Sequence, residues 1–143
     1  MKKPYKILIW VALGIWVIAL IMALSPKIMK LHREKENAEK TFAAFSGNLV
    51  NQRYQDAYGL SGSDFRQAAS FNEFVEQQKK YRDEFGSLTS VHQAASDVEG
   101  KGTPMFWRAV IDADLVFEKK TVRFEFVFRQ EGGRWVLFGY QQM

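Results

Sequence analysis

The chain begins with a long apolar run and then changes to mixed patterns of apolar and polar residues. Ile7–Leu24 contains 18 residues without a charge, and lysines lie on both sides of this run. As a helix it would span about 27 Å, close to the thickness of the hydrocarbon core of a bilayer. The pattern therefore predicts a single helix that crosses a membrane, with Tyr5 at the interface.

A cleaved signal peptide is the alternative reading of this segment. The apolar stretch of a signal peptide is shorter, about 7–15 residues, and small residues precede the cleavage site. The candidate triplet Ala23-Leu24-Ser25 is followed by Pro26, which is unfavourable after a cleavage site. We therefore expect an uncleaved anchor, with a cytoplasmic head and membrane segment in residues 1–30 and a folded domain in residues 31–143.

The orientation of the anchor is less well determined by charge, because basic residues lie on both sides of Ile7–Leu24. A short head with three lysines is typical of an N-terminus that stays inside, and long domains are translocated largely regardless of charge. We expect a single-pass protein of the inner cell membrane, with its domain outside the cytoplasm and the lipid bilayer as partner of Ile7–Leu24.

The region after the membrane segment has the spacing of an amphipathic helix. Ala38, Phe42, Phe45 and Leu49 follow one another at steps of three and four residues. This spacing places them on one stripe and predicts a helix that is buried along that stripe. Pro26 is expected to kink the junction between this helix and the membrane helix.

Two further helices are predicted before the chain changes its pattern. Tyr54–Leu60 has the apolar spacing of a short helix, which is expected to end at Ser61-Gly62-Ser63. Ser70 and Glu73 match a capping box, in which each side chain accepts a hydrogen bond from the backbone of the other residue. A third helix should therefore begin after Ser70 and stop at Gly86.

From Ser87 onward the apolar residues alternate, which is typical of β-strands. Three helices followed by strands joined through short turns predict an α+β fold, with the helices packed on one face of a curved antiparallel sheet of about four strands. The expected strands are Leu88–Ser96, Met105–Phe117, Val122–Phe128 and Trp135–Gln141, with a loop at Glu99–Pro104 and hairpins at Glu118–Thr121 and Gln130–Arg134.

Alternation also assigns the two faces of the sheet. If Lys119-Lys120 forms the first turn, Leu115 lies opposite Phe124 and the core face is rich in phenylalanine. The same register places Asp114 opposite Glu125, and such a like-charge pair destabilises a sheet. A cation, a basic residue of a partner or the nearby Arg123 could relieve this repulsion.

The second turn at Gly132-Gly133 places Phe126 opposite Gly139 and gives the face that points away from the core an apolar part. A solvated strand face is normally polar, so a contiguous apolar patch predicts a protein partner or a homodimer. Coverage by the early helices or by the C-terminus is an equal alternative. The candidate interaction patch consists of Val116, Val127, Val136, Phe138 and Tyr140.

The order of elements and four segments resemble the nuclear-transport-factor-like superfamily of cone-shaped, or cystatin-like, α+β domains. The resemblance covers residues 38–141, and it is nearest to small membrane-anchored or secreted bacterial domains of unknown function. Because the superfamily includes isomerases, dehydratases, cyclases, secretion-system scaffolds and binding modules, its fold carries no single function. The segments are YQDAYGLSGSDFR (Tyr54–Arg66), FxxF (Phe71–Phe74), FGSLTSV (Phe85–Val91) and GGRWVLFGY (Gly132–Tyr140).

Composition excludes several classes of site and of partner. The chain has no cysteine and two histidines, which excludes disulfides, thiolate nucleophiles and histidine-rich metal sites. The net charge is +4, but residues 1–35 hold seven basic residues and one acidic residue, whereas the rest holds 13 basic and 15 acidic residues. The basic excess therefore suits lipid headgroups, and we expect no nucleic acid as partner.

Enzymes of the resembling superfamily place an Asp, often with a His or Tyr, inside the cone. In this chain the core-facing strand positions are apolar, and Asp112 and Asp114 fall on the opposite face. Pairing of these carboxylates with Arg123 and Arg129 is the simpler explanation for them. His92 lies in the weak first strand without an evident carboxylate partner, so we expect no catalytic residue, no metal and no cofactor.

Three functions remain open at this point. The first is a membrane-tethered, non-enzymatic interaction domain, a subunit or assembly factor of a cell-envelope complex. The second is a small-molecule-binding domain that uses the cone, and the third and weakest is an isomerase- or hydrolase-like enzyme. A filled cone with an exposed patch would favour the first function, and an open apolar cavity would favour the second. Candidate pocket residues, for which core packing is the favoured explanation, are Tyr54, Tyr58, Tyr81 and Trp107.

Overall fold

The computed structural model describes residues 4–103 and 105–143. Lys2, Lys3 and Pro104 lie outside the described residues, as does the side chain of Tyr5, the expected interface residue. The chain divides into two compact units, Met1–Arg33 and Glu34–Met143. The second unit contains the whole sheet and is referred to below as the domain.

The first helix, α1, runs from Pro4 to Val50. It continues through Pro26, so the expected membrane and domain helices are assigned as one element. Its most apolar 18-residue window has a mean hydropathy of 2.2, and no residue of this window is buried. Trp16, for example, is 77% exposed. The helix is therefore long and apolar enough to cross a membrane.

Three further helices follow in the domain: α2 (Tyr54–Gly59), α3 (Ser63–Ala68) and α4 (Phe71–Phe85). The predicted capping box is present at the start of α4, where the Ser70 hydroxyl accepts from the Glu73 amide and the Glu73 carboxylate accepts from the Ser70 amide. Gly86 ends α4 with a φ of 83°, which favours glycine. Helix α3 was not predicted, because six residues with one buried position, Phe65, produce no recognisable period.

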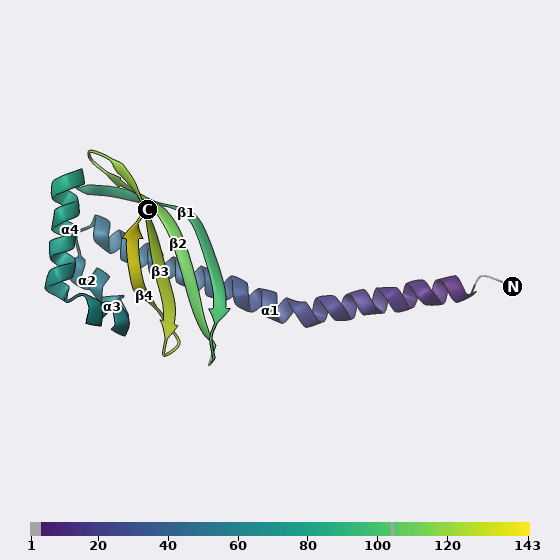
Figure 1. Ribbon diagram of the computed structural model, residues 1–143. Helices are drawn as coiled ribbons and strands as arrows, with labels where there is room; N and C mark the ends of the chain where they lie inside the picture. The colour runs from purple at the N-terminus through teal and green to yellow at the C-terminus, as the bar shows by residue number, and fades with distance from the viewer. Residues whose placement is uncertain (1–3, 104) are drawn as a thin grey trace. The chain divides into compact units, whose positions relative to one another are not determined.

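The four strands are β1 (Leu88–Lys101), β2 (Phe106–Phe117), β3 (Thr121–Glu131) and β4 (Arg134–Gln142). They form one antiparallel sheet in the order β1-β2-β3-β4 (Figure 1). The predicted α+β class with a four-stranded curved sheet is thus confirmed. Strand β1 continues past its expected end at Ser96 and takes up part of the predicted loop.

The register between β2 and β3 differs from the prediction by two residues. Leu115 lies opposite Val122, and Ala113 lies opposite Phe124. The first hairpin is displaced because its tip bonds elsewhere: the Glu118 amide donates to the Ser87 carbonyl and the Lys119 amide donates to the Phe85 carbonyl. Because side chains alternate with a period of two, this shift preserves both faces of the sheet and changes only the cross-strand partners.

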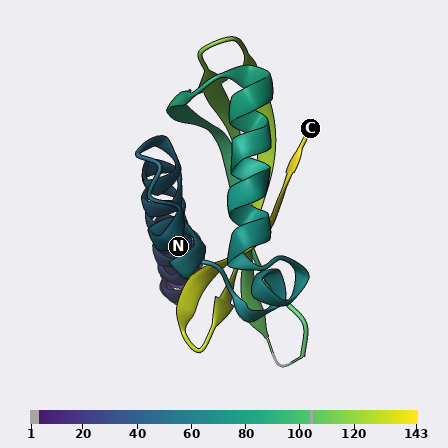
Figure 2. The same ribbon diagram turned by 90° about the vertical axis from the view of Figure 1, so that its left-hand side faces the viewer.

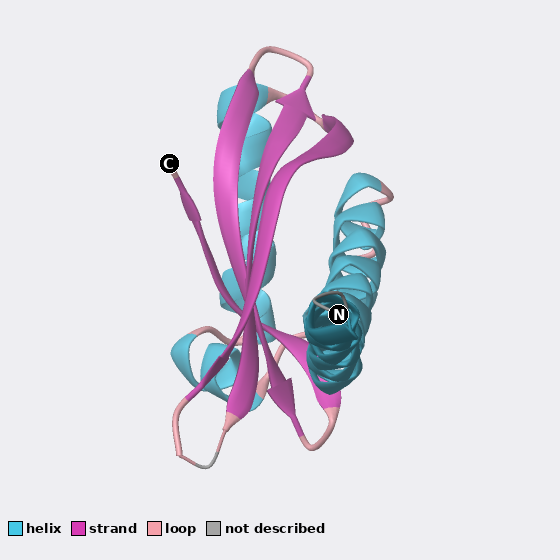
Figure 3. Cartoon of the chain, turned by 90° about the vertical axis from the view of Figure 1, so that its right-hand side faces the viewer, coloured by secondary structure: helices cyan, strands magenta, loops and turns pink. Residues whose placement is uncertain are grey.

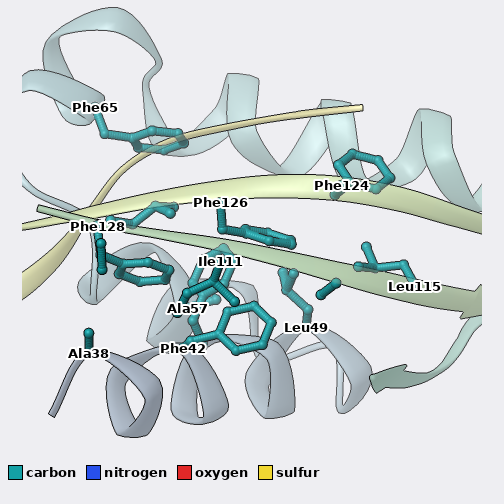
Figure 4. Close-up of a cluster of buried hydrophobic side chains, with 14 of the residues drawn as sticks. Ala38, Phe42, Leu49, Ala57, Phe65, Ile111, Leu115, Phe124, Phe126 and Phe128 are labelled. Carbon is teal, nitrogen blue, oxygen red and sulfur yellow. The ribbon is translucent and has the colours of Figure 1, made fainter. Parts of the chain in front are cut away.

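The core lies between one face of the sheet and the helices α1 and α4. Figures 2 and 3 view the domain from opposite sides, with α4 in front of the sheet in Figure 2 and behind it in Figure 3. The predicted stripe of α1 packs against the phenylalanines of β3, with the rings of Phe42 and Phe126 5.2 Å apart (Figure 4). All four stripe residues and all three phenylalanines of β3 are buried: Ala38, Phe42, Phe45, Leu49, Phe124, Phe126 and Phe128.

Replacing Phe126 by alanine should unfold the domain far more readily than the same change at Phe138. Phe126 is 1% exposed, and removing its ring leaves a cavity that costs about 3–5 kcal/mol. Phe138 is 41% exposed, so its loss should cost less than about 1 kcal/mol. Chemical unfolding of the full chain in detergent micelles, followed by circular dichroism, measures both. Equal losses for the two variants would contradict this core.

Candidate interaction surface

The space between the sheet and the helices α1 and α4, referred to below as the cone, is occupied by side chains of the core. Phe124, Phe126 and Phe128 are each at most 1% exposed and fill the space between sheet and helices. A cavity at one end of the cone, lined by residues that include Tyr54, Tyr81 and Leu115, has a volume of 20 Å³. This volume holds about one water molecule, whereas a small-molecule site needs roughly 300–1,000 Å³.

The candidate pocket residues Tyr54, Tyr58, Tyr81 and Trp107 are partly buried and pack against the core. The Tyr58 hydroxyl donates to the Ala69 carbonyl at 2.9 Å, which anchors α2 to the end of α3. Burial raises the pKa of Tyr81, and the charge of Glu84 raises it further. These aromatic residues therefore pack against the core, which was the favoured explanation for them.

Tyr140 does not lie on the outer face, so this part of the predicted patch is wrong. Phe128 pairs with Leu137, but Gly139 pairs with Val127 and not with Phe126 as predicted, so Phe138 is an extra residue in β4. This β-bulge resets the alternation and turns Tyr140 towards the core. Its ring lies 5.8 Å from that of Phe126.

The hydroxyl of Tyr140 joins β4 to α4. It accepts a hydrogen bond from the Gln78 amide at 3.0 Å and donates to the side-chain oxygen of Gln77. Burial raises the pKa of Tyr140 well above its usual value, and the hydrogen bond from Gln78 opposes this rise. The phenol is therefore neutral at physiological pH and serves to hold α4 on the sheet.

Val136 lies on the outer face but is 4% exposed. The segment after α2 covers it: the Gly62 amide donates to the Leu137 carbonyl, and the Leu137 amide donates to the Leu60 carbonyl. A Cβ on Gly62 would lie 2.7 Å from Cγ2 of Val136, so only glycine allows this close approach. At this end of β4 the face is therefore covered by the connection between α2 and α3, and not by the early helices themselves or by the C-terminus.

The remaining patch residues are accessible to different degrees. Val116 and Val127 are half-buried, and Phe138 is exposed. The Phe138 ring lies 4.5 Å from the guanidinium carbon of Arg129, a cation–π contact. Arg129 also faces the ring of Phe106, an exposed residue at the start of β2 that sequence reasoning missed.

The outer face also carries carboxylates with contrasting surroundings. Asp114 lies opposite Arg123, not opposite Glu125 as predicted, and it accepts two hydrogen bonds from the guanidinium at 2.8 and 2.9 Å. These bonds lower the pKa of Asp114. The like-charge pair is instead formed by Asp112 and Glu125, which lie directly opposite each other. Oδ1 of Asp112 is buried and has no hydrogen-bond partner.

His92 lies opposite Asp114 on this same face, outside the cone. Its ring is 3.2 Å from the Ser90 hydroxyl. The sequence offered no carboxylate partner for His92, and the pairing of β1 with β2 supplies one. The carboxylate of Asp114 is already bound to Arg123, so it is not free to act together with His92 as an acid–base couple.

Two hollows lie on the surface of the domain. One, of 260 Å³, is on the outer face over β3 and β4 and is lined by Glu125, Val127, Phe138, Gly139, Tyr140 and Gln141. The other, of 620 Å³, lies along α4 and the end of α3 and is lined by Ala68, Ala69, Asn72, Glu73, Glu76, Gln77, Lys80, Tyr81 and Glu84. Among the described residues, no group of three or more His, Asp or Glu side chains is arranged to hold a metal ion.

A comparison with protein-family models and with curated proteins finds no match to this chain. The resemblance to the nuclear-transport-factor-like superfamily therefore stays a prediction. The function of the chain has to be argued from its own surfaces.

Replacing Tyr140 by phenylalanine should destabilise the domain by about 1 kcal/mol, because the side chains of Gln77 and Gln78 lose their buried partner. Tyr54 is a matched control: it also packs against the core, and among the described residues its hydroxyl has no hydrogen-bond partner. The Tyr54→Phe variant should unfold at the same denaturant concentration as the parent chain. If the Tyr140→Phe variant is as stable as this control, the conclusion that the Tyr140 side chain points towards the core and binds α4 is contradicted.

Proposed function

We propose that this chain is a membrane-tethered, non-enzymatic interaction domain, a subunit or assembly factor of a cell-envelope complex. The observation that carries the proposal is the contrast between the filled cone and the accessible outer face. Phe124, Phe126 and Phe128 occupy the interior, while Phe138 and Phe106 are exposed on the other side of the sheet.

The filled cone argues against the small-molecule alternative. A ligand needs a concave site that removes most of its surface from water, and the 20 Å³ cavity beside Leu115 cannot supply one. An enzyme of this architecture would also need an ionisable side chain in that interior. On β2 the positions that face it, such as Ala109, Ile111 and Leu115, are apolar and buried, and the phenol that β4 turns towards it, Tyr140, is bound to Gln77 and Gln78.

The outer face supports the interaction function through its composition. Aromatic residues and arginine are enriched in protein interfaces, and here Arg129 is flanked by the rings of Phe106 and Phe138. The remaining patch is smaller than predicted, because Val136 is buried and the Tyr140 ring is turned towards the core. A partner would therefore bind chiefly near Val127 and Phe138.

The membrane anchor allows binding at this small surface to be effective. An anchor in the inner membrane confines the domain close to other membrane proteins and raises the effective concentration of the partners. The basic residues Lys27, Lys30 and Arg33 follow the apolar run and suit anionic headgroups. A weak contact at the outer face is then sufficient for assembly at the membrane.

A photo-crosslinking amino acid placed at Phe138 in the full chain, in its native membrane, tests the proposed surface. It should give an adduct of one discrete mass, because the side chain lies in the proposed interface. Phe71 is the matched control, since it is a phenylalanine of similar exposure, 37%, on α4. No adduct from Phe138, or the same adducts from both positions, would contradict the proposal.

The proposed orientation is tested separately. Protease added to spheroplasts should digest the domain and leave the anchor in the membrane, and the uncleaved chain should stay in the membrane after alkaline extraction. Domain protection until the membrane is permeabilised would place the domain in the cytoplasm. Release of a shortened chain by alkaline extraction would show that the apolar run is a cleaved signal peptide.

A further inference from the structure

The middle of the outer face has a local excess of negative charge. Asp112 and Glu125 lie side by side on β2 and β3, and Asp97 lies in the neighbouring row, opposite Val110. Among the described residues, none of these three carboxylates forms an ion pair. Like charges directly opposite each other destabilise a sheet.

The nearest basic groups are committed to other carboxylates. Arg123 donates two hydrogen bonds to Asp114 and affects Asp112 only through space. Arg129 is held by Asp64, with Glu131 at 3.7 Å. The buried Oδ1 of Asp112 therefore lacks a donor, which costs free energy in a folded domain.

The hollow on the outer face begins at this acidic pair. Glu125 forms part of its wall, Val127 and Phe138 give it apolar sides, and Gly139 leaves space where other residues have a side chain. A Cβ added to Gly139 would meet nothing within 4 Å, so the space above this residue is open. Glu125 accepts a hydrogen bond from the Gln141 side-chain amide at 3.2 Å, but among the described residues no cation pairs with Glu125 or Asp112. An apolar cleft beside two carboxylates without a cation is complementary to an apolar side chain that lies next to a cationic one.

We propose that the outer face binds a cationic segment of a partner protein, which places a Lys or Arg between Asp112 and Glu125 and an adjacent apolar side chain in the hollow over Gly139. This inference rests on the proposed interaction function and specifies the chemistry of its partner. A second copy of this domain is a poorer occupant, because its own outer face has the same unpaired carboxylates and would repel them.

The cation supplies a counter-charge for this carboxylate pair, although it does not reach Oδ1 of Asp112, which is buried. An ammonium or guanidinium group donates hydrogen bonds to both carboxylates and removes the repulsion between them. Charge therefore selects the partner, and the apolar hollow adds to its affinity.

The test uses two synthetic peptides of equal length, one of alternating Lys and Val and one of alternating Glu and Val, with the full chain in nanodiscs. Fluorescence anisotropy should show binding of the Lys–Val peptide only. The double variant Asp112→Asn, Glu125→Gln should weaken this binding about tenfold. The matched control Asp83→Asn, Glu84→Gln removes the same charge from exposed positions of α4 and should leave the affinity unchanged.

A second variant tests the hollow without changing charge. In Gly139→Val the new Cβ meets no atom within 4 Å, and the methyl groups take up open space, so this variant should also weaken binding of the Lys–Val peptide. Equal loss in the Asp83, Glu84 control, equal binding of the Glu–Val peptide, or an unchanged affinity in both outer-face variants would overturn the inference. If these results occur while Phe138 still crosslinks to one partner in the membrane, the proposed function stands and only the cationic chemistry of the partner is wrong. Loss of the Phe138 adduct is the failure of the proposed function itself.

Discussion

The packing of β3 against one stripe of α1 is the contact on which the rest of the domain depends. Phe126 and Phe128 meet Phe42 and Phe45 at ring distances between 5.2 and 6.4 Å. Burial of such rings contributes roughly 1.5–3 kcal/mol for each side chain. Because the rings fill the space between sheet and helices, the cavity beside Leu115 has a volume of 20 Å³.

The filled interior shifts attention to the opposite face of the sheet. There the polar residues are not uniformly satisfied: Asp114 is paired with Arg123, whereas Asp112 faces Glu125 and has a buried oxygen without a partner. Native domains retain such costly arrangements chiefly where function requires them. The domain thus combines an apolar interior with an outer face on which, among the described residues, Asp112 and Glu125 lie opposite each other without an ion pair.

Local patterns in the sequence predicted the helices and strands well, and the register between the strands less well. The stripe from Ala38 to Leu49 and the capping box at Ser70 were correct, because each is a periodic or short-range feature. The two-residue shift between β2 and β3 was invisible, since alternation is unchanged by it. The bulge at Phe138 and the cover that Gly62 places over Val136 depend on tertiary contacts. The glycine at position 139, inside a strand, was the available hint of a bulge.

Hydrogen–deuterium exchange of the full chain in nanodiscs tests the central claim most directly. If the stripe of α1 is part of the core, the amides from Ala38 to Leu49 should exchange with the same free energy as those of β2 and β3, as one cooperative unit. Much faster exchange in this part of α1 than in the strands would contradict the account. It would mean that the helix leaves the sheet readily, that the phenylalanine cone opens, and that a ligand-binding interior has to be considered again.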